Sequence, residues 1–178
     1  MKLSQWKGIY PVIFITLVAF VSVALVAWTD SITKAQIENQ QEQKIQSMLK
    51  EMFPDMSRYT LEDDIYIIYS DGAEVGYAFL AVGKGYGGKI SILVGLEDED
   101  TIKGITIISQ SETPGLGGRI AESAFADAFA GVNVNDVALR QEGGQIDGIT
   151  GATISSRAVV EAVRATAMEK VKALKERR

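Results

Sequence analysis

One uncharged run near the N-terminus constrains this chain more than any other feature of its sequence. Residues 10–29, YPVIFITLVAFVSVALVAWT, contain no Asp, Glu, Lys or Arg. About 19 residues of helix span roughly 28 Å, which is close to the thickness of the hydrocarbon layer of a bilayer. A buried helix of a soluble domain normally shows a polar face, and this run shows none. The run therefore predicts a transmembrane helix over residues 9–29.

The lysines ahead of this run predict its orientation. Lys2, Lys7 and the α-amino group precede it, whereas the segment that follows carries both signs of charge. Cytoplasmic flanks of transmembrane helices are enriched in Lys and Arg, so we expect residues 1–8 in the cytoplasm and residues 30–178 outside the cell membrane. A cleaved signal peptide is the alternative, although the run is longer than a typical h-region and no A-x-A site follows it.

The residue types that the chain lacks exclude several kinds of site. Its 178 residues include no cysteine and no histidine. Thiolate or imidazole metal sites, cysteine nucleophiles, Ser-His triads, iron–sulfur clusters and histidine-ligated haem are therefore excluded within this chain. The net charge is −5, and the basic residues do not gather into a patch threaded with aromatics. Nucleic acid is not expected as a partner.

Beyond the predicted span, the apolar pattern predicts an α+β protein in two further parts. A linker helix is expected over residues 30–54, ending before Pro54. A domain over residues 55–178 is expected to hold an antiparallel twisted sheet with helices packed on it. The linker carries a thin apolar stripe, expected to dock on the domain, made of Ile37, Ile45, Met48 and Met52.

Four stretches rich in β-branched residues predict a four-stranded antiparallel meander. They lie at residues 64–70, 74–83, 88–96 and 101–109. Asp71-Gly72 separates the first two and marks a hairpin turn.

After the sheet, the chain is expected to alternate between helices and short strands. A helical apolar face predicts a helix over residues 119–131, and short strands are expected near residues 137–140 and 145–149. The final helix is predicted from about Ser155 to the C-terminus. Its buried face recurs at spacings of three and four, at Val160, Val163, Ala167, Val171 and Leu174.

The strongest candidate site is DGITGATISS, residues 147–156, where a glycine turn leads into the final helix. Free N–H groups and the dipole at a helix start attract phosphate, and Gly148 and Gly151 let a ligand approach the backbone closely. The stretch has neither the lysine of a P-loop nor G-x-G-x-x-G spacing. The alternative is that Ser155 or Ser156 simply caps the helix.

The hydroxyl groups of this stretch lack a neighbouring base. A threonine hydroxyl is a poor nucleophile without one, and no His or Lys stands within the motif. Chemistry at Thr153 would therefore require an external catalyst. Two glycine-rich stretches, SETPGLGG at residues 111–118 and GKGYGG at residues 83–88, are further candidates for ligand contact, with plain loops as the alternative for both.

Together these motifs resemble the FMN-binding subunit family of membrane redox pumps, which comprises the G subunit of Rnf complexes and the C subunit of sodium-pumping NADH:quinone reductases. The resemblance rests on GKGYGGKISILVG, ETPGLGGRI and DGITGATISSRAVVEAV, together with the N-terminal span and the linker helix. The last stretch fits the family's flavinylation pattern, Asp-x-x-Thr/Ser-Gly-Ala-Thr. The chain is short for the quinone-reductase subunit, so the Rnf type is favoured.

The resemblance implies an FMN-binding domain over residues 55–178 and suggests roles for individual residues. In the family, the final hydroxyl of the pattern carries FMN through a phosphoester, which places covalent FMN on Thr153. In the family a glycine-rich loop also lies against the flavin ring, so the resemblance implies that Glu112, Thr113 and Leu116 pack against the flavin or form hydrogen bonds with it. Many members of that family have a histidine two residues before that glutamate, where this chain has Gln110, or Ser111 if the register shifts by one. The remaining positions of the flavinylation pattern are Asp147, Thr150, Gly151 and Ala152.

The function implied by the resemblance is electron transfer at a membrane. The chain would be a flavoprotein subunit of an ion-translocating, Rnf-type electron-transport complex that links ferredoxin and NAD. Its partners would be other membrane subunits and a flavin transferase that attaches the FMN, and it would have no catalytic acid, catalytic base or metal of its own. The alternatives are the C subunit of a sodium-pumping NADH:quinone reductase, another flavinylated membrane redox protein, or a non-redox, membrane-tethered module that binds a phosphate ligand or a partner.

Overall fold

The computed structural model describes residues 9–177, with side chains described over residues 10–29 and 42–177. Contacts within the chain divide it into two compact units, Met1–Gln46 and Ser47–Arg178. The main elements are the helices α1 (Ile9–Met52), α2 (Ser123–Ala126) and α3 (Thr153–Arg177) and the strands β1 (Arg58–Glu62), β2 (Ile65–Ser70), β3 (Ala73–Lys84), β4 (Lys89–Leu96) and β5 (Ile102–Ser109).

The first unit consists of most of α1, and its apolar part has the length needed to cross a membrane. Tyr10–Thr29 has a mean hydropathy of 2.5, and its side chains are exposed. By length and composition, this stretch can span a bilayer as a helix. The helix continues without a break to Met52, so the predicted end before Pro54 is confirmed. Ile37 of the predicted apolar stripe lies outside the described side chains.

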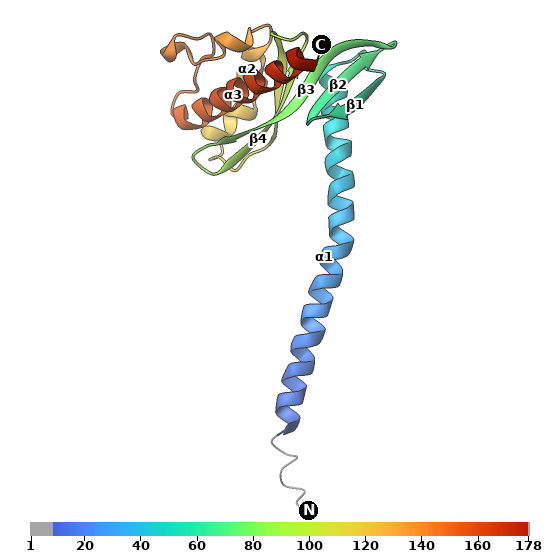
Figure 1. The fold of residues 1–178 in the computed structure, drawn as a ribbon. Coiled ribbons are helices and arrows are strands. Elements are labelled where there is room, and N and C mark those ends of the chain that lie inside the picture. The colour runs from blue at the N-terminus through green and yellow to red at the C-terminus, as the bar shows by residue number, and fades with distance from the viewer. Residues whose placement is uncertain (1–8, 178) are drawn as a thin grey trace, which may run out of the picture. The chain divides into compact units, whose positions relative to one another are not determined.

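The second unit contains an antiparallel sheet with the strand order β1-β2-β3-β4-β5 (Figure 1). The predicted α+β architecture is confirmed, and so is the hairpin at Asp71-Gly72, whose φ angles are 49° and 87°. The predicted meander was wrong in having four strands, because β1 also pairs with β2 along its whole length. Asp63 (φ 49°) and Asp64 (φ 60°) form the two-residue turn between them. Aspartate tolerates this left-handed backbone, so the turn forms without the glycine that usually marks it.

One face of the sheet carries the main hydrophobic core. Helix α3 lies against β3 and β4 on this face (Figure 1). The residues predicted to form its buried face are all buried, and Val159 joins them. They pack in one cluster with Phe79, Ile92 and Val94 of the strands. Removing this apolar surface from water supplies about 25 cal/mol per Å², which is the main force that holds α3 on the sheet.

The opposite face of the sheet is partly covered by the residues that join α1 to β1. Alternation along the strands places Gly76 and Gly95 on this face, away from α3. A methyl group on Gly76 would overlap the Phe53 ring, and one on Gly95 would overlap the Met52 sulfur. Leu49 and Phe53 are buried here. Part of the predicted apolar stripe therefore does pack on the sheet.

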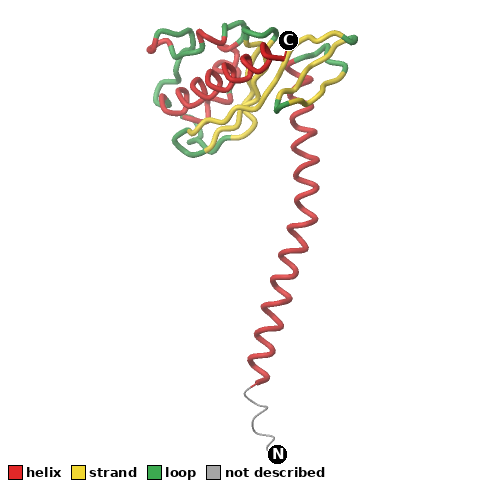
Figure 2. Tube along the Cα trace, in the orientation of Figure 1, coloured by secondary structure: helices red, strands yellow, loops and turns green. Residues whose placement is uncertain are grey.

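The segment between β5 and α3 is mostly loop and short turns (Figure 2). The helix predicted over residues 119–131 is wrong as a single element. It is divided into η2 (Gly117–Ala121), α2 and η3 (Asp127–Phe129), because Glu122 takes an extended backbone with φ −75° and ψ 144°. The apolar side chains that suggested a helix are nevertheless buried in the core, namely Ile120, Phe125 and Phe129.

The short strands expected near residues 137–140 and 145–149 are also wrong. Within the described residues, this region holds a single parallel bridge between Leu139 and Ile146, with the 3₁₀ turn η5 (Arg140–Glu142) between them. Gly143, with φ 88°, ends that turn and reverses the chain. Both bridge residues are buried, so their apolar character reflects anchoring of a loop rather than a strand.

Candidate functional site

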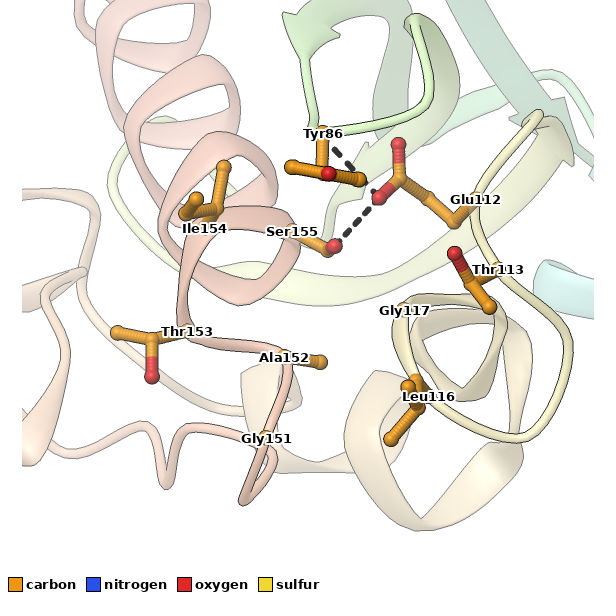
Figure 3. Close-up of a pocket in the computed structure, with 10 residues that line it drawn as sticks. All are labelled: Tyr86, Glu112, Thr113, Leu116, Gly117, Gly151, Ala152, Thr153, Ile154 and Ser155. Atoms are coloured by element: carbon orange, nitrogen blue, oxygen red, sulfur yellow. Dashed lines mark hydrogen bonds between the residues drawn. The ribbon is translucent and has the colours of Figure 1, made fainter.

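Three segments that are distant in the sequence line a cleft of about 400 Å³ in the second unit (Figure 3). They are the turn between β3 and β4, the loop after β5 and the first turn of α3. The cleft brings together six of the predicted site residues and leaves out Asp147 and Thr150. Its lining consists of Tyr86, Glu112, Thr113, Leu116, Gly117, Gly151, Ala152, Thr153, Ile154 and Ser155.

Glu112 connects the three segments through its carboxylate. One oxygen accepts hydrogen bonds from the Ser155 hydroxyl at 2.5 Å and the Tyr86 N–H at 3.2 Å (Figure 3). The other accepts a hydrogen bond from the Gly87 N–H at 2.9 Å. The residue is only 6% exposed. Hydrogen bonds to a carboxylate are stronger than those between neutral groups, so this buried cluster fixes the loop against both neighbours.

Glycines allow the three segments to approach Glu112 so closely. A methyl group on Gly85 would overlap the Glu112 carboxylate, and one on Gly87 would overlap the carbonyl oxygen of Ser111. One on Gly117 would lie 2.6 Å from the Ser155 hydroxyl oxygen. Close packing around Glu112 and its loop therefore explains the glycines at positions 85, 87 and 117.

The side chain of Gln110 fixes the start of the same loop. Its carbonyl oxygen accepts a hydrogen bond of 2.5 Å from the Glu112 N–H. The amide oxygen of Gln110 therefore holds the backbone of the loop at Glu112.

Helix α3 begins at Thr153, and the expectation that Ser155 or Ser156 caps it is wrong. Both serines lie within the first turns of the helix and are buried. Ser155 donates to Glu112. The Ser156 hydroxyl donates to the Ala152 carbonyl at 3.1 Å and accepts from the Ile149 N–H at 3.0 Å, which fixes the turn that precedes the helix.

The start of α3 leaves its first N–H groups at the cleft. Gly151 has a left-handed backbone with φ 80°, and this residue turns the chain into the helix. The first N–H groups of a helix have no acceptor one turn earlier, so the cleft presents both these donors and the positive end of the helix dipole. The Thr153 side chain is exposed and points away from Glu112 and Leu116 in Figure 3.

Asp147 and Thr150 lie outside the cleft, beside a second hollow that Arg119 also lines. Asp147 makes a bidentate ion pair with Arg140, with N–O distances of 2.6 Å and 3.1 Å. This hydrogen-bonded pair lowers the pKa of the Asp147 carboxyl and raises the pKa of Arg140. In this structure Asp147 therefore supports the loop that leads to α3 rather than lining the cleft.

Four residues of the cleft were not among the predicted site residues. Tyr86 stands at the centre of the glycine-rich hairpin, and its position among four glycines was the available signal. Ile154 and Ser155 follow Thr153 directly, and their place next to the predicted attachment residue was the available signal. Gly117 was recognisable only as part of a glycine-rich loop. No pattern within any one segment indicates that these residues meet.

Sequence comparison identifies two family regions in the chain. Residues 85–167 match the FMN-binding domain family, and residues 12–52 match the RnfG N-terminal region. The G subunit of the ion-translocating oxidoreductase complex of Aliivibrio fischeri (strain MJ11) is 35% identical over 84% of this chain and 84% of its own length. The protein of the same name from Methanosarcina acetivorans is 35% identical over 90% of this chain and 94% of its own length.

Two solved structures have folds similar to that of this chain. The C subunit of the Na⁺-translocating NADH-quinone reductase of Parabacteroides distasonis has a TM-score of 0.52 and 27% identity, over 60% of this chain and 61% of that chain. NqrC of Shewanella oneidensis has a TM-score of 0.51 and 19% identity, over 68% of this chain and 74% of that chain, which indicates a shared fold. The extent of the sequence identity shows that this chain belongs to the family of G subunits of ion-translocating oxidoreductase complexes.

Proposed function

We propose that this chain is a membrane-anchored flavoprotein electron carrier whose FMN is attached through a phosphoester to Thr153. The observation that carries the proposal is the cleft, which places the start of α3 beside the 111–117 loop and the Tyr86 hairpin. The match of residues 85–167 to the FMN-binding domain family supports FMN as the cofactor.

The start of α3 has the chemistry needed to hold the phosphate of FMN. Free N–H groups and the helix dipole favour an anion at this position. Gly151 keeps the approach open, since it has no side chain and lies exposed two residues before the helix begins at Thr153. The Thr153 hydroxyl is exposed and therefore accessible to a modifying enzyme.

The rest of the cleft suits a flat, largely apolar ring with polar edges. Exposed surfaces of Tyr86, Leu116 and Ile154 lie at the cleft, with exposed fractions of 77%, 48% and 57%. Aromatic and aliphatic side chains of this kind line most cofactor sites, and a few polar groups fix the orientation of the ligand. Thr113 would supply such a polar group at the loop.

The flavin would supply the redox chemistry, and the protein would hold and orient it. The described residues that line the cleft include no Lys, Arg, Cys or His, and both oxygens of their one carboxylate, Glu112, already accept hydrogen bonds from the protein. We therefore expect no side chain of the cleft to activate the Thr153 hydroxyl. A separate flavin transferase would therefore form the phosphoester. This agrees with the absence of a base within the motif itself.

The family of the chain supports a place in an ion-translocating complex. The relatives are named as subunits of such complexes, and we propose that other membrane subunits pack on the apolar part of α1. In this proposal, residues 1–8 are the cytoplasmic N-terminus and residues 9–29 the transmembrane helix. Residues 30–54 are the linker helix, and residues 55–178 are the FMN-binding domain. The positive-inside rule favours a cytoplasmic N-terminus and an FMN domain on the outer side of the cell membrane. Electron exchange between ferredoxin and NAD is the reaction proposed for the whole complex.

Expression of the full chain with and without a flavin transferase tests the attachment. After a denaturing gel, we expect flavin fluorescence in the band only when the transferase is present. Thr153→Ala should lose essentially all of this signal, and Thr153→Ser should keep part of it because the hydroxyl remains. Thr166→Ala, a half-buried threonine farther along α3, is the matched control and should keep the full signal.

The fluorescence of the wild-type band decides between the flavoprotein and its alternative, a non-redox, membrane-tethered module that binds a phosphate ligand or a partner. A dark wild-type band in the presence of an active transferase would rule out the covalent flavoprotein. A fluorescent Thr153→Ala band would show that the flavin is attached elsewhere.

A further inference from the structure

We infer that Glu112 is a positioning residue for the flavin, acting through the Tyr86 hairpin and Ser155 instead of binding the flavin with its own carboxylate. This inference rests on the proposed function, because it concerns the same cleft. Its direct evidence is the buried hydrogen-bond cluster, which involves only side chains and backbone of this chain.

The carboxylate of Glu112 is engaged by the protein itself. Three donors reach its two oxygens, and the residues that supply them lie 25, 26 and 43 positions away in the sequence. Ser155 is only 2% exposed and Glu112 only 6%, so the cluster is closed to solvent. Although Glu112 contributes to the cleft wall, both of its oxygens already have partners.

Each partner of Glu112 belongs to a segment that carries an exposed group of the cleft. The N–H of Tyr86 is bound, whereas its side chain extends freely, with an exposed fraction of 77% for the residue. Ser155 lies two residues after Thr153, in the first turn of α3. The carboxylate therefore sets the position of the aromatic side chain relative to the attachment point.

Glu112→Gln is a sharp test because an amide cannot satisfy all three donors. If its NH₂ group replaces the oxygen near Gly87, the Gly87 N–H faces a donor. If it replaces the other oxygen, Ser155 can turn to accept, but the Tyr86 N–H then faces a donor. In either orientation one backbone N–H of the hairpin loses its acceptor, while the shape of the side chain is kept.

Two measurements on the full chain in detergent follow from this. Hydrogen-exchange mass spectrometry of peptides that contain residues 86–87 should show exchange about tenfold faster in Glu112→Gln, which corresponds to the loss of one hydrogen bond to a charged acceptor. On protein loaded by a flavin transferase, the visible circular dichroism and the midpoint potential of the flavin should both shift. Ser155→Ala keeps both backbone bonds and should shift the flavin signals without the faster exchange at residues 86–87.

Two controls separate positioning from general loss of stability. Glu122→Gln removes a carboxylate from an exposed ion pair with Arg119 and should change neither measurement. Ile105→Val in the core should lower the midpoint of urea unfolding and leave the flavin signals unchanged.

The outcomes distinguish this inference from the proposed function. Unchanged exchange in Glu112→Gln would overturn it, and so would faster exchange with flavin signals identical to those of the wild type. If Glu112→Gln fails to fold, Ser155→Ala alone decides through the flavin signals. A wild-type protein that takes up no flavin would overturn the proposed function and this inference together.

Discussion

At the scale of single residues, the site depends on how closely backbones approach Glu112. Gly87 is the clearest case, because a methyl group there would overlap the carbonyl oxygen of Ser111. A backbone atom cannot move aside as a flexible side chain can, so the hairpin and the loop would have to separate. Glycine is therefore required at position 87 by the contact between the hairpin and the loop at Ser111, and not by the conformation of the turn itself.

Gly87→Ala is therefore expected to lower the free energy of unfolding by about 1–3 kcal/mol, as overpacked sites do. Gly104→Ala is the matched control, since a methyl group at Gly104 in β5 meets no atom within 4 Å. Urea unfolding of both variants, as full chains in detergent, measures the difference. Equal stabilities for the two variants would contradict the close packing seen here.

At the scale of elements, the turn between β4 and β5 is held by an acidic side chain. The Asp98 carboxylate accepts hydrogen bonds from the Asp100 N–H at 2.8 Å and the Thr101 N–H at 2.7 Å. These bonds, chiefly the one from Asp100, lower the pKa of Asp98 below its ordinary value of 3.8. The turn is thus stabilised by the charged form of the side chain.

This shift sets the sign of a pH dependence. A carboxyl whose pKa is lower in the folded state contributes stability above about pH 3.8, and this contribution is lost as the pH falls through its folded pKa. Asp98→Asn keeps an acceptor oxygen but does not titrate. The stability advantage of the wild type over Asp98→Asn should be constant between pH 7 and pH 5 and shrink below about pH 4. Thermal unfolding at several pH values tests this, and a constant difference down to pH 2.5 would contradict it.

At the scale of the whole molecule, the boundary between the two units predicts where the chain can be shortened. The unit Ser47–Arg178 includes the last turn of α1, with Leu49, and the residues that follow, with Phe53. These two residues are 0% and 3% exposed and cover one face of the sheet. The start of this unit is therefore part of the folded domain, although it belongs to a long helix.

A protein that begins at Ser47 is expected to be soluble and cooperatively folded, whereas one that begins at Arg58 should be less stable or aggregate. The reason is that the shorter protein exposes the face normally covered by Phe53. Circular dichroism and thermal unfolding of the two proteins provide the comparison. Identical unfolding curves for the two proteins would show that the cover provided by Phe53 is dispensable.

Removal of residues 1–46 should also abolish fractionation with membranes, because it deletes Tyr10–Thr29.

The parts of the structure that could be predicted are those coded by neighbouring residues. The apolar span, the end of α1 before Pro54, the Asp71-Gly72 hairpin and the buried face of α3 all follow from local periodicity or turn chemistry. Predictions failed where local signals were weak or misleading. The turn at Asp63-Asp64 lacks glycine, and the apolar pattern of residues 119–131 serves three short turns instead of one helix.

The sequence by itself thus determined the apolar span, four strands of the sheet and the final helix, the resemblance of its motifs to a flavin-binding family and the single threonine expected to carry the flavin. Only the tertiary structure decided that Ser155 is bound by Glu112 instead of capping α3, that Tyr86 joins the same cleft, and that Asp147 pairs with Arg140 outside it. The physical reason is the range of the interactions. Propensity and periodicity act over a few residues, whereas a hydrogen bond between positions 43 residues apart depends on how the whole domain packs.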